Sequence, residues 1–232
     1  MTTNSDGDRP PARRSGRLPV DEAHDLGERI LSVARDHFVR DGFNGTSMDA
    51  IAAAVPVTKR TLYQRFGSKR RLLQSFREWQ RDQYKEAVTL PPPDGSLREK
   101  LTNLALQILD ISLAPESRGM ERLTLEINRD DPGLADELQM SLINHWTGYF
   151  RQVLEDELSP ADTSAERIDL LADCLFDLLV MGQRTRIRKW RQLDDTITAK
   201  TEYIARILDI AADGIPALAR DPVDRVQTAD AC

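Results

Sequence analysis

The feature that most constrains the fold is a series of three closely spaced helix starts between residues 46 and 68. The stretch "TSMD" has a capping-box pattern, with Thr46 as N-cap and an acid three residues later. Pro56 then limits this helix to about two turns. Thr58 can cap a third short helix, and Gly67-Ser68 begins a fourth. Two short helices joined by a tight turn predict a helix-turn-helix.

A longer helix precedes this series and begins near Asp25. Ile30, Ala34 and Phe38 lie on one of its faces, and Gly42 in "RDGF" is placed to end it. Helical spacing of apolar residues continues in the second and fourth helices. These residues are Met48, Ile51, Ala52 and Val55, and then Leu72, Leu73, Phe76 and Trp79.

The remainder of the chain also has the pattern of helices. "LPPPDGS" at 90–96 is a clear break. We find no alternation typical of strands and no internal repeat, and therefore predict an all-α fold of roughly nine helices. Later helix starts are predicted at the Ser96–Glu99 capping box, at Asp131-Pro132 (a helix toward Leu158), at the Thr163–Glu166 capping box (a helix to about Arg188) and at Asp195 (a helix to Gly214).

Charge is distributed unevenly along the chain. Residues 1–90 carry 16 Lys and Arg against 12 Asp and Glu, whereas residues 91–232 carry 16 against 26. A basic first part joined to an acidic second part indicates an anionic partner for the first part only.

Several cations stand where helices begin. Lys59 and Arg60 fall in the first turn of the third helix, and Lys69, Arg70 and Arg71 in that of the fourth. There each cation opposes the helix dipole, by roughly 0.3–1 kcal/mol. A phosphate bound at the helix starts would reverse that repulsion. The alternative is an ordinary solvated charged surface, but no acid occurs between Asp49 and Glu78, so we predict DNA binding.

Residues 46–73, "TSMDAIAAAVPVTKRTLYQRFGSKRRLL", resemble the DNA-binding signature of the TetR family of bacterial transcriptional regulators. In one respect they differ, because Val55-Pro56 replaces the family's usual Ala-Gly. Proline cannot adopt the positive φ available to glycine, so we expect a different backbone shape at that turn. The positions that match the family pattern are Ile51, Ala52, Val57, Thr58, Thr61, Leu62, Tyr63, Phe66, Ser68, Lys69 and Leu72.

The resemblance implies specific contacts with double-stranded DNA. Thr46 and Ser47 would touch phosphate, and Thr58, Tyr63 and Lys69 would hold the DNA backbone. The residues that would face base edges are Lys59, Arg60, Thr61 and Gln64. For Arg60 a plain phosphate contact is the alternative. Arg13, Arg14 and Arg17 could reach a minor groove, or belong to a solvated tail.

The last two long helices carry wide apolar stripes, which include Leu171, Leu175, Leu178, Ile204, Ile207 and Leu208. The resemblance implies that these two helices pair into a four-helix bundle in a homodimer. The alternative is that both stripes belong to the chain's own core. "LEINRDDPGLADEL" resembles a subgroup of TetR ligand domains called AefR-like.

The resemblance also implies a pocket for a small-molecule effector of unknown identity. "INHWTGYF" supplies apolar and polar side chains suited to such a site, although an aromatic run can equally be core. The candidate pocket residues are Met120, His145, Trp146, Tyr149, Phe150 and Met181. A second basic cluster, "RTRIRKWRQ" at 184–192, could bind an acidic ligand or nucleic acid, or end a helix in solvent.

Other classes of function lack the residues they need. The two cysteines form no metal or disulfide pattern, and we expect Cys174 to be a core residue. We find no catalytic motif, no cofactor motif, no secretory signal and no membrane-spanning segment, so we predict a cytoplasmic protein that is not an enzyme.

The predicted organisation has four parts: a disordered tail (1–20), a helix-turn-helix DNA-binding domain (21–88), a helical effector-binding and dimerisation domain (97–214) and a C-terminal tail (215–232). The predicted function is a homodimeric repressor that leaves a palindromic operator when it binds an effector. The alternatives are an architectural DNA-binding protein without an effector, and a protein-interaction module.

Overall fold

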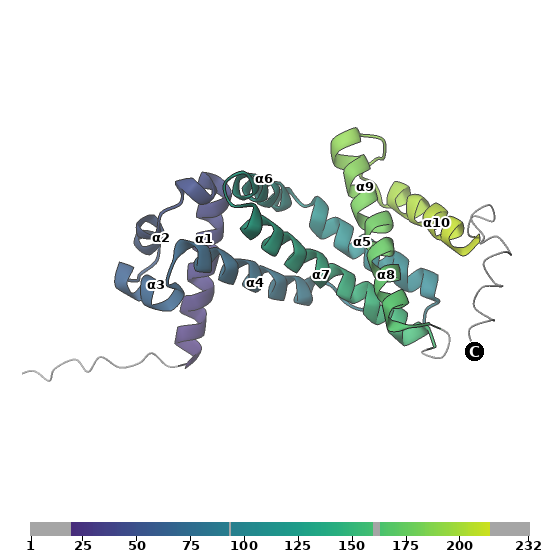
Figure 1. Ribbon diagram of the computed structural model, residues 1–232, viewed down its shortest axis with the longest axis horizontal. Coiled ribbons are helices and arrows are strands. Elements are labelled where there is room, and N and C mark those ends of the chain that lie inside the picture. Colours follow the sequence, from purple (N-terminus) through teal and green to yellow (C-terminus); the bar gives the residue numbers. More distant parts are fainter. Residues whose placement is uncertain (1–19, 93, 160–162, 214–232) are drawn as a thin grey trace, which may run out of the picture.

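The computed structural model describes residues 20–92, 94–159 and 163–213, and every regular element in those ranges is helical. The molecule is elongated, with α1–α3 at one end, α8–α10 at the other and α4–α7 running between them (Figure 1). The elements are α1 (Val20–Gly45), α2 (Met48–Ala54), α3 (Lys59–Phe66), α4 (Lys69–Ala87), α5 (Leu97–Leu113), α6 (Pro115–Asp130), α7 (Pro132–Glu157), α8 (Ala165–Phe176), the π-helical turn η1 (Asp177–Met181), α9 (Gly182–Thr185), the π-helical turn η2 (Arg186–Trp190) and α10 (Ile197–Asp213).

The three closely spaced helix starts are present, with one correction. The side chains of Ser47, Thr58 and Ser68 accept hydrogen bonds from backbone N–H groups in the first turns of α2, α3 and α4. The N-cap of α2 is therefore Ser47 and not the predicted Thr46. The Thr46 hydroxyl instead donates to the Gly42 carbonyl at 2.7 Å. Gly42 has φ 75° and ψ 175°, so the helical backbone of α1 is broken at the glycine that the sequence places at its end, and one further turn follows to Gly45.

Two very tight turns bound α3. The Val57 N–H donates to the Val55 carbonyl at 2.7 Å, which closes a three-residue turn centred on Pro56. Such a γ-turn needs a negative φ at its centre, which proline supplies. Between α2 and α3 no residue has a positive φ, so the turn has the different backbone shape that Pro56 predicts. The second turn is centred on Gly67 (φ 75°), where the Ser68 N–H donates to the Phe66 carbonyl at 2.8 Å.

The later helix starts are largely as predicted. Ser96 and Glu99 form the capping box of α5, and Asp131 caps α7, which has Pro132 in its first turn. Two starts are corrected by one or two residues. Ser164 rather than Thr163 caps α8, because its hydroxyl accepts the Arg167 N–H. Thr196 accepts the Ala199 N–H, so α10 begins at Ile197 rather than at Asp195.

The helix predicted to run to about Arg188 continues to Trp190 through the π-helical turns on either side of α9. The predicted tails, Arg13, Arg14 and Arg17, the end of the last helix at Gly214, and Cys232 lie outside the described residues.

Two hydrophobic cores form, and the boundary between them does not follow the break at 90–96. The first core joins α1–α4 to α6 and to the N-terminal half of α7, through residues such as Leu123, Ile127 and Leu134. The second joins α5, the C-terminal half of α7, α8 and α10. α4 contacts both cores, through Trp79 in the first and Tyr84 in the second. The helix-turn-helix is therefore packed against helices that follow it by more than 40 residues in sequence.

The contact between α1 and α6 depends on a residue without a side chain. Gly119 is buried on α6, and a Cβ atom there would lie 2.3 Å from Cγ1 of Val39. Val39 is β-branched and lies on a helix, so its side chain has one strongly preferred rotamer and cannot easily swing away. Glycine at this position lets the two helices approach closely.

We expect Gly119→Ala to lower the free energy of unfolding by about 1–2 kcal/mol, because the overlap with Val39 outweighs the helix propensity gained. Gly148 on α7 provides the control, since a Cβ atom added there would meet no neighbouring atom within 4 Å. Gly148→Ala should raise the same free energy by about 0.5–1 kcal/mol. Urea unfolding of both variants measures the difference, and stabilisation by both would contradict the close contact.

Candidate nucleic-acid interface

The two sides of α3 have opposite character. Leu62 and Phe66 are buried in the first core. The other side is exposed and entirely polar or aromatic; it consists of Lys59, Arg60, Thr61, Tyr63, Gln64 and Arg65. Tyr63 is 42% exposed, which is unusual for a large aromatic residue. Every residue that we predict to face DNA bases is therefore accessible in the folded chain.

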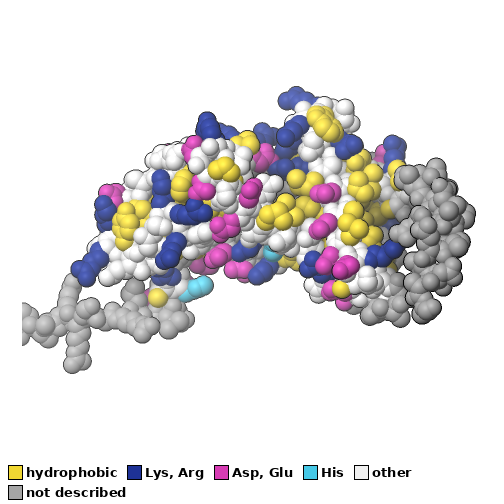
Figure 2. Space-filling model, in the orientation of Figure 1, with side chains coloured by type: hydrophobic (Ala, Val, Ile, Leu, Met, Phe, Trp, Pro, Cys, Tyr) yellow, Lys and Arg dark blue, Asp and Glu magenta, His cyan; other side chains and the backbone are white. Residues whose placement is uncertain are grey.

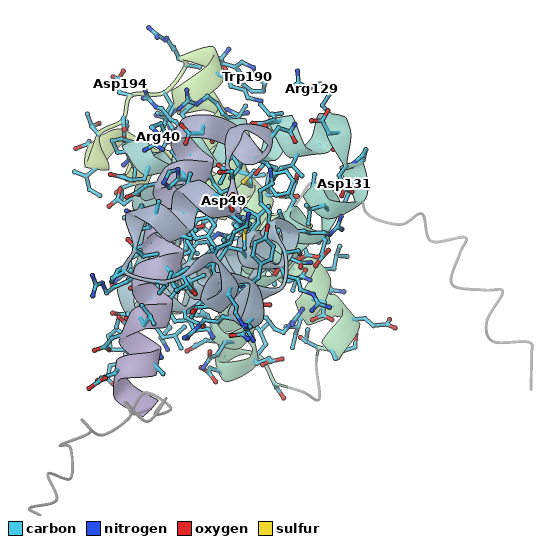
Figure 3. The ribbon with its side chains drawn as sticks, turned by 90° about the vertical axis from the view of Figure 1, so that its left-hand side faces the viewer. Arg40, Asp49, Arg129, Asp131, Trp190 and Asp194 are labelled. Carbon is cyan, nitrogen blue, oxygen red and sulfur yellow. The ribbon has the colours of Figure 1, made fainter. Side chains whose placement is uncertain are left out.

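The first turn of α3 is held by two local interactions. Thr58 Oγ1 accepts the Thr61 N–H at 3.1 Å and lies 2.8 Å from the Thr61 hydroxyl. Lys59 Nζ lies 2.7 Å from Oδ1 of Asp49 on α2. A hydrogen bond from Lys59 to Asp49, and then the charge of that carboxylate, raise the pKa of the Lys59 ammonium. Figure 3 looks onto this end of the molecule and shows Asp49 near its centre.

Lys69 is an internal anchor in this structure. Its ammonium donates to the carbonyl oxygens of Phe43 (2.6 Å), Thr46 (2.9 Å) and Asn44 (3.4 Å). It also lies 4.6 Å from the centre of the Phe43 ring. Burial lowers the pKa of Lys69. Its three N–H groups are all donated to carbonyls, so Lys69 joins the start of α4 to the end of α1.

Arg70 and Gln74 contact acids from the corner between α6 and α7. Arg70 forms an ion pair with Asp131 and lies 3.8 Å from Glu137. Gln74 donates to Glu137 at 2.8 Å. Of the three cations in the first turn of α4, Arg71 alone has neither an ion pair nor a side-chain hydrogen bond among the described residues. Of the three cations at the start of α4 for which the sequence predicts a phosphate contact, two are thus satisfied within the chain.

The corner between α6 and α7 also forms hydrogen bonds with the end of α1. Glu126 Oε1 accepts the Asn44 N–H at 2.9 Å, and Asp130 accepts from the Asn44 amide at 2.6 Å. From the sequence, Asp131 is interpreted only as the start of a helix. The contacts that Glu126, Asp130 and Asp131 make with Asn44 and Arg70 are therefore not predicted. Asp131 does cap α7, through the Leu134 N–H at 3.0 Å, and its other oxygen pairs with Arg70. An acidic pair between two helices, facing a basic helix start elsewhere, is the signal that could have indicated them.

Exposed positions in the helix-turn-helix retain unpaired groups. Arg60, Gln64 and Tyr63 have no side-chain hydrogen bond or ion pair within the described ranges, and Arg60 is fully on the outer side of α3. Ser47 is exposed, whereas Thr46 is 2% exposed and its hydroxyl is bonded to Gly42. Arg65 belongs to the scaffold, since it donates to the Ala23 carbonyl at 2.8 Å.

The predicted pocket residues do not surround one cavity. Met120 is part of the first core, whereas Trp146 and Phe150 are buried in the second, with Tyr149 and Met181 packed at its edge. His145 alone lines a cavity, of about 560 Å³, between α4 and α7. Its Nε2 is buried without a partner, and burial, followed by the charges of Arg81 and Lys85, lowers the pKa of His145.

The predicted dimer residues divide into three groups by burial. Ile204 and Leu208 are buried in the second core, while Leu171, Leu175 and Ile207 are partly buried against it. Leu178 is 46% exposed.

Cys174 is exposed on α8, so the expectation that it is a core residue is wrong, because the helix turns its side chain away from α5 and α7. Hydrophobic side chains gather along α8 on the face shown in Figure 2, and exposed Leu170 and Ile210 are further apolar residues of α8 and α10.

The described helices include none long and apolar enough to cross a membrane. No group of His, Cys, Asp or Glu in the described ranges could hold a metal ion.

Comparison with known proteins agrees with the geometry of α1–α4. Residues 30–76 match the family model described as bacterial regulatory proteins, tetR family. An uncharacterised HTH-type transcriptional regulator of Mycobacterium tuberculosis is 28% identical over 151 residues, which cover 65% of this chain and 70% of that protein. The HTH-type transcriptional regulator SrpR of Pseudomonas putida is 23% identical over 207 residues, which cover 89% and 91% of the two chains.

Solved structures share the fold across most of the chain. The flavonoid-responsive regulator FrrA superposes with a TM-score of 0.70 at 24% identity, covering 82% of this chain and 97% of its own. A putative TetR-family regulator from Mesorhizobium loti gives a TM-score of 0.65 at 17% identity, covering 83% and 98%. Residues 30–76, which include α2 and α3, are thus similar to the DNA-binding segment of tetR-family regulators, and the chain has the fold of solved TetR-family proteins over most of its length.

Proposed function

We propose that the chain is a homodimeric repressor that binds a near-palindromic operator through α3 and leaves it when a small-molecule effector binds. The observation that carries this proposal is the exposed side of α3, opposite the buried Leu62 and Phe66. There Arg60, Tyr63 and Gln64 are accessible and form no side-chain hydrogen bond or ion pair with the residues that the structure describes. Arg and Gln are suited to guanine and adenine edges in a major groove. The protein would act in the cytoplasm, where bacterial DNA lies.

The proposed DNA contacts follow the accessibility of each group. Arg60, Thr61 and Gln64 face base edges, with Lys59 beside them, while Ser47, Thr58 and Tyr63 contact the backbone. Arg71 is the cation of the α4 start that is available for phosphate. For Lys69 we propose an indirect role, because its ammonium must leave a carbonyl before it can reach a phosphate.

A homodimer supplies the second reading helix that a palindromic operator requires. The proposed interface is the outer face of α8, η1 and α10, where Leu170, Leu178 and Ile210 respectively are exposed. Exposed apolar side chains on two neighbouring helices are typical of surfaces that pair with another copy. Leu171, Leu175 and Ile207 would contribute their uncovered portions, while Ile204 and Leu208 support them from within.

Release of DNA on effector binding requires that the effector-binding region and α3 be mechanically joined. We propose that residues 21–88 and 97–214 are functional units, the first for DNA and the second for the effector and the dimer. They share the first core, and α4 contacts both cores. An effector that prefers one arrangement of α4 and α6 would shift the population of dimers away from the DNA-binding spacing.

The affinity for DNA tests this proposal. It is measured for the DNA that flanks the gene and for random DNA of equal length, over a range of salt concentrations. A specific repressor should prefer its own flank. Equal affinity with equal salt slopes would favour an architectural DNA-binding protein, since phosphate contacts carry no sequence information. Absence of binding at low salt would favour a protein-interaction module.

Asp49 lowers the positive charge of the DNA-facing end, so its removal should strengthen binding. We expect Asp49→Asn to steepen the slope of log K against log salt by about 0.9 and to tighten binding to random DNA roughly eightfold near 0.1 M salt, because Lys59 becomes free for a phosphate. Fluorescence anisotropy titrations measure both quantities.

The control for Asp49→Asn is Glu202→Gln, which removes an exposed acid from α10 at the other end of the molecule. Glu202→Gln should leave the slope unchanged. Equal slopes for Asp49→Asn and the unmodified protein would show that freeing Lys59 from Asp49 adds no phosphate contact.

Leu178→Glu should convert the dimer to monomers, because it places a charge in the proposed apolar interface. Sedimentation velocity measures the change, and operator affinity should fall at least tenfold, since a single head reads only a half-site. Leu125→Glu on α6 is the matched control, as Leu125 is 70% exposed and lies outside the interface. A dimer that survives Leu178→Glu would place the interface elsewhere.

A further inference from the structure

A second cavity lies between α6, the end of α5 and η2, at the opposite end of α6 from its contact with Asn44. Its volume is about 610 Å³, within the range of small-molecule sites. Apolar side chains of Leu113, Ile187 and Leu193 form part of its lining. The cations that line it are Arg118, Arg188, Lys189 and Arg191. η2 and the turn that follows it protrude beside α9 in Figure 1, and Trp190 and Asp194 mark this region in Figure 3.

Positive charge exceeds negative charge where the cavity meets α6. Glu121 Oε1 accepts from Arg188 Nη1 at 2.7 Å and also pairs with Arg184. One carboxylate is thus shared by two guanidinium groups. The Arg184 side chain is only 20% exposed and the Arg188 side chain 12%. Arg118 adds a third cation, whose charge, after burial itself, lowers the pKa of Arg188. The two partly buried guanidinium groups, of Arg184 and Arg188, have a single acid between them, and this favours an added anion.

Two further acids, Asp194 and Asp195, also line the cavity, so that its four cations face three acids. Asp195 lies 2.8 Å from Lys200 Nζ, which also pairs with Asp110. Arg118, Lys189 and Arg191 form no ion pair with any described residue. The guanidinium groups of Arg118 and Arg191 therefore remain able to make the two parallel hydrogen bonds that carboxylates and phosphates accept.

The backbone at this cavity is unusual. η2 is a π-helical turn, a form that occurs frequently at functional sites. It ends at Arg191, whose φ of 52° makes it the one non-glycine residue with positive φ in the described chain. A left-handed conformation costs an arginine energy, and such strain gathers at ligand sites. Here it sets Arg191 at the cavity rim after the helix has ended.

We propose that this cavity binds a small organic acid, whose carboxylate or phosphate group lies between Arg118, Arg188 and Arg191 and whose apolar body contacts Leu113, Ile187 and Leu193. The combination of clustered guanidinium groups with aliphatic side chains matches an anion that carries hydrocarbon. An inorganic anion would leave the aliphatic lining unused.

The same helix that lines this cavity also supports the DNA-facing end. Arg118 and Glu121 face the cavity, while the neighbouring Gly119 packs on Val39 of α1 and Glu126 bonds to Asn44. An acid bound by Arg118 would therefore alter the position of a helix that contacts α1. For this effect on DNA the inference rests on the proposed function, whereas binding of the acid does not depend on it.

Calorimetric titration of the full chain without DNA tests the binding step. The probes are sodium benzoate, sodium hexanoate and inorganic phosphate, with the neutral benzamide as a matched control and ionic strength held constant. We expect benzoate and hexanoate to bind, phosphate to bind more weakly and benzamide not to bind. No heat from either organic acid, or equal binding of benzamide, would overturn the proposal. Phosphate binding as tight as benzoate would overturn its apolar part.

Two sets of substitutions locate the site. Arg118→Gln with Arg191→Gln should weaken benzoate binding about tenfold to a hundredfold, since each lost charged hydrogen bond is worth roughly a factor of ten. Both residues are exposed, so the fold should survive. Arg122→Gln, on the exposed side of the same helix, is the matched control and should bind benzoate normally. Unchanged benzoate binding by the double variant would overturn the assignment.

Titration with random DNA separates this site from a nucleic-acid surface. If the double variant lost affinity for random DNA but bound benzoate normally, the basic cluster would be a nucleic-acid surface and the inference would be wrong. Operator release by benzoate is measured separately. If benzoate binds and DNA binding fails, the repressor proposal falls and the acid site stands.

Discussion

The contact between α1 and α6 determines how the rest of the molecule is arranged. Gly119 allows the two helices to approach until Val39 fills the space where a side chain would stand. Glu126 then reaches the backbone N–H of Asn44. Because of this contact, the first hydrophobic core contains residues from α6 and α7 as well as from α1–α4. A TetR-family DNA-binding segment that matches as a separate unit in sequence is thus, physically, part of a larger packed body.

Cations in the helix-turn-helix have different roles depending on what lies opposite them. Lys69 is bonded to three carbonyl oxygens at the end of α1, and those oxygens carry the partial negative charge of helix ends. Arg70 is neutralised by Asp131. Arg60 and Arg71 face solvent without a partner among the described residues. The rule that a cation opposes a helix start holds for all of them, but only the unpaired ones need an external anion to offset it.

Features governed by neighbouring residues could be predicted from the sequence. Thr58, Ser68, the Ser96–Glu99 capping box and Asp131 are all identifiable as helix starts, because a cap depends on residues within one turn. Errors of one residue arise where two hydroxyl residues stand side by side, as with Thr46 and Ser47. Contacts between distant segments could not be predicted. Nothing near Lys69 in sequence shows that it meets Phe43 or that Arg70 meets Asp131. Met120 and Phe150 lie in separate cores because α6 packs into the first core, whereas α7 crosses from the first core to the second.

The position of α3 is fixed more firmly than that of an ordinary surface helix. A hydrogen-bonded γ-turn lies immediately before it and another immediately after it, centred on Pro56 and Gly67. Leu62 and Phe66 hold its inner side in the first core. Since proline fixes φ, the turn before α3 has little freedom to change shape. In the proposed mechanism, a ligand that acts on α6 would therefore reach α3 by moving α1 and α4 as one body with it, rather than by reshaping α3. Such a movement would alter the separation of the two α3 helices in the proposed dimer while the side chains of each α3 keep their arrangement.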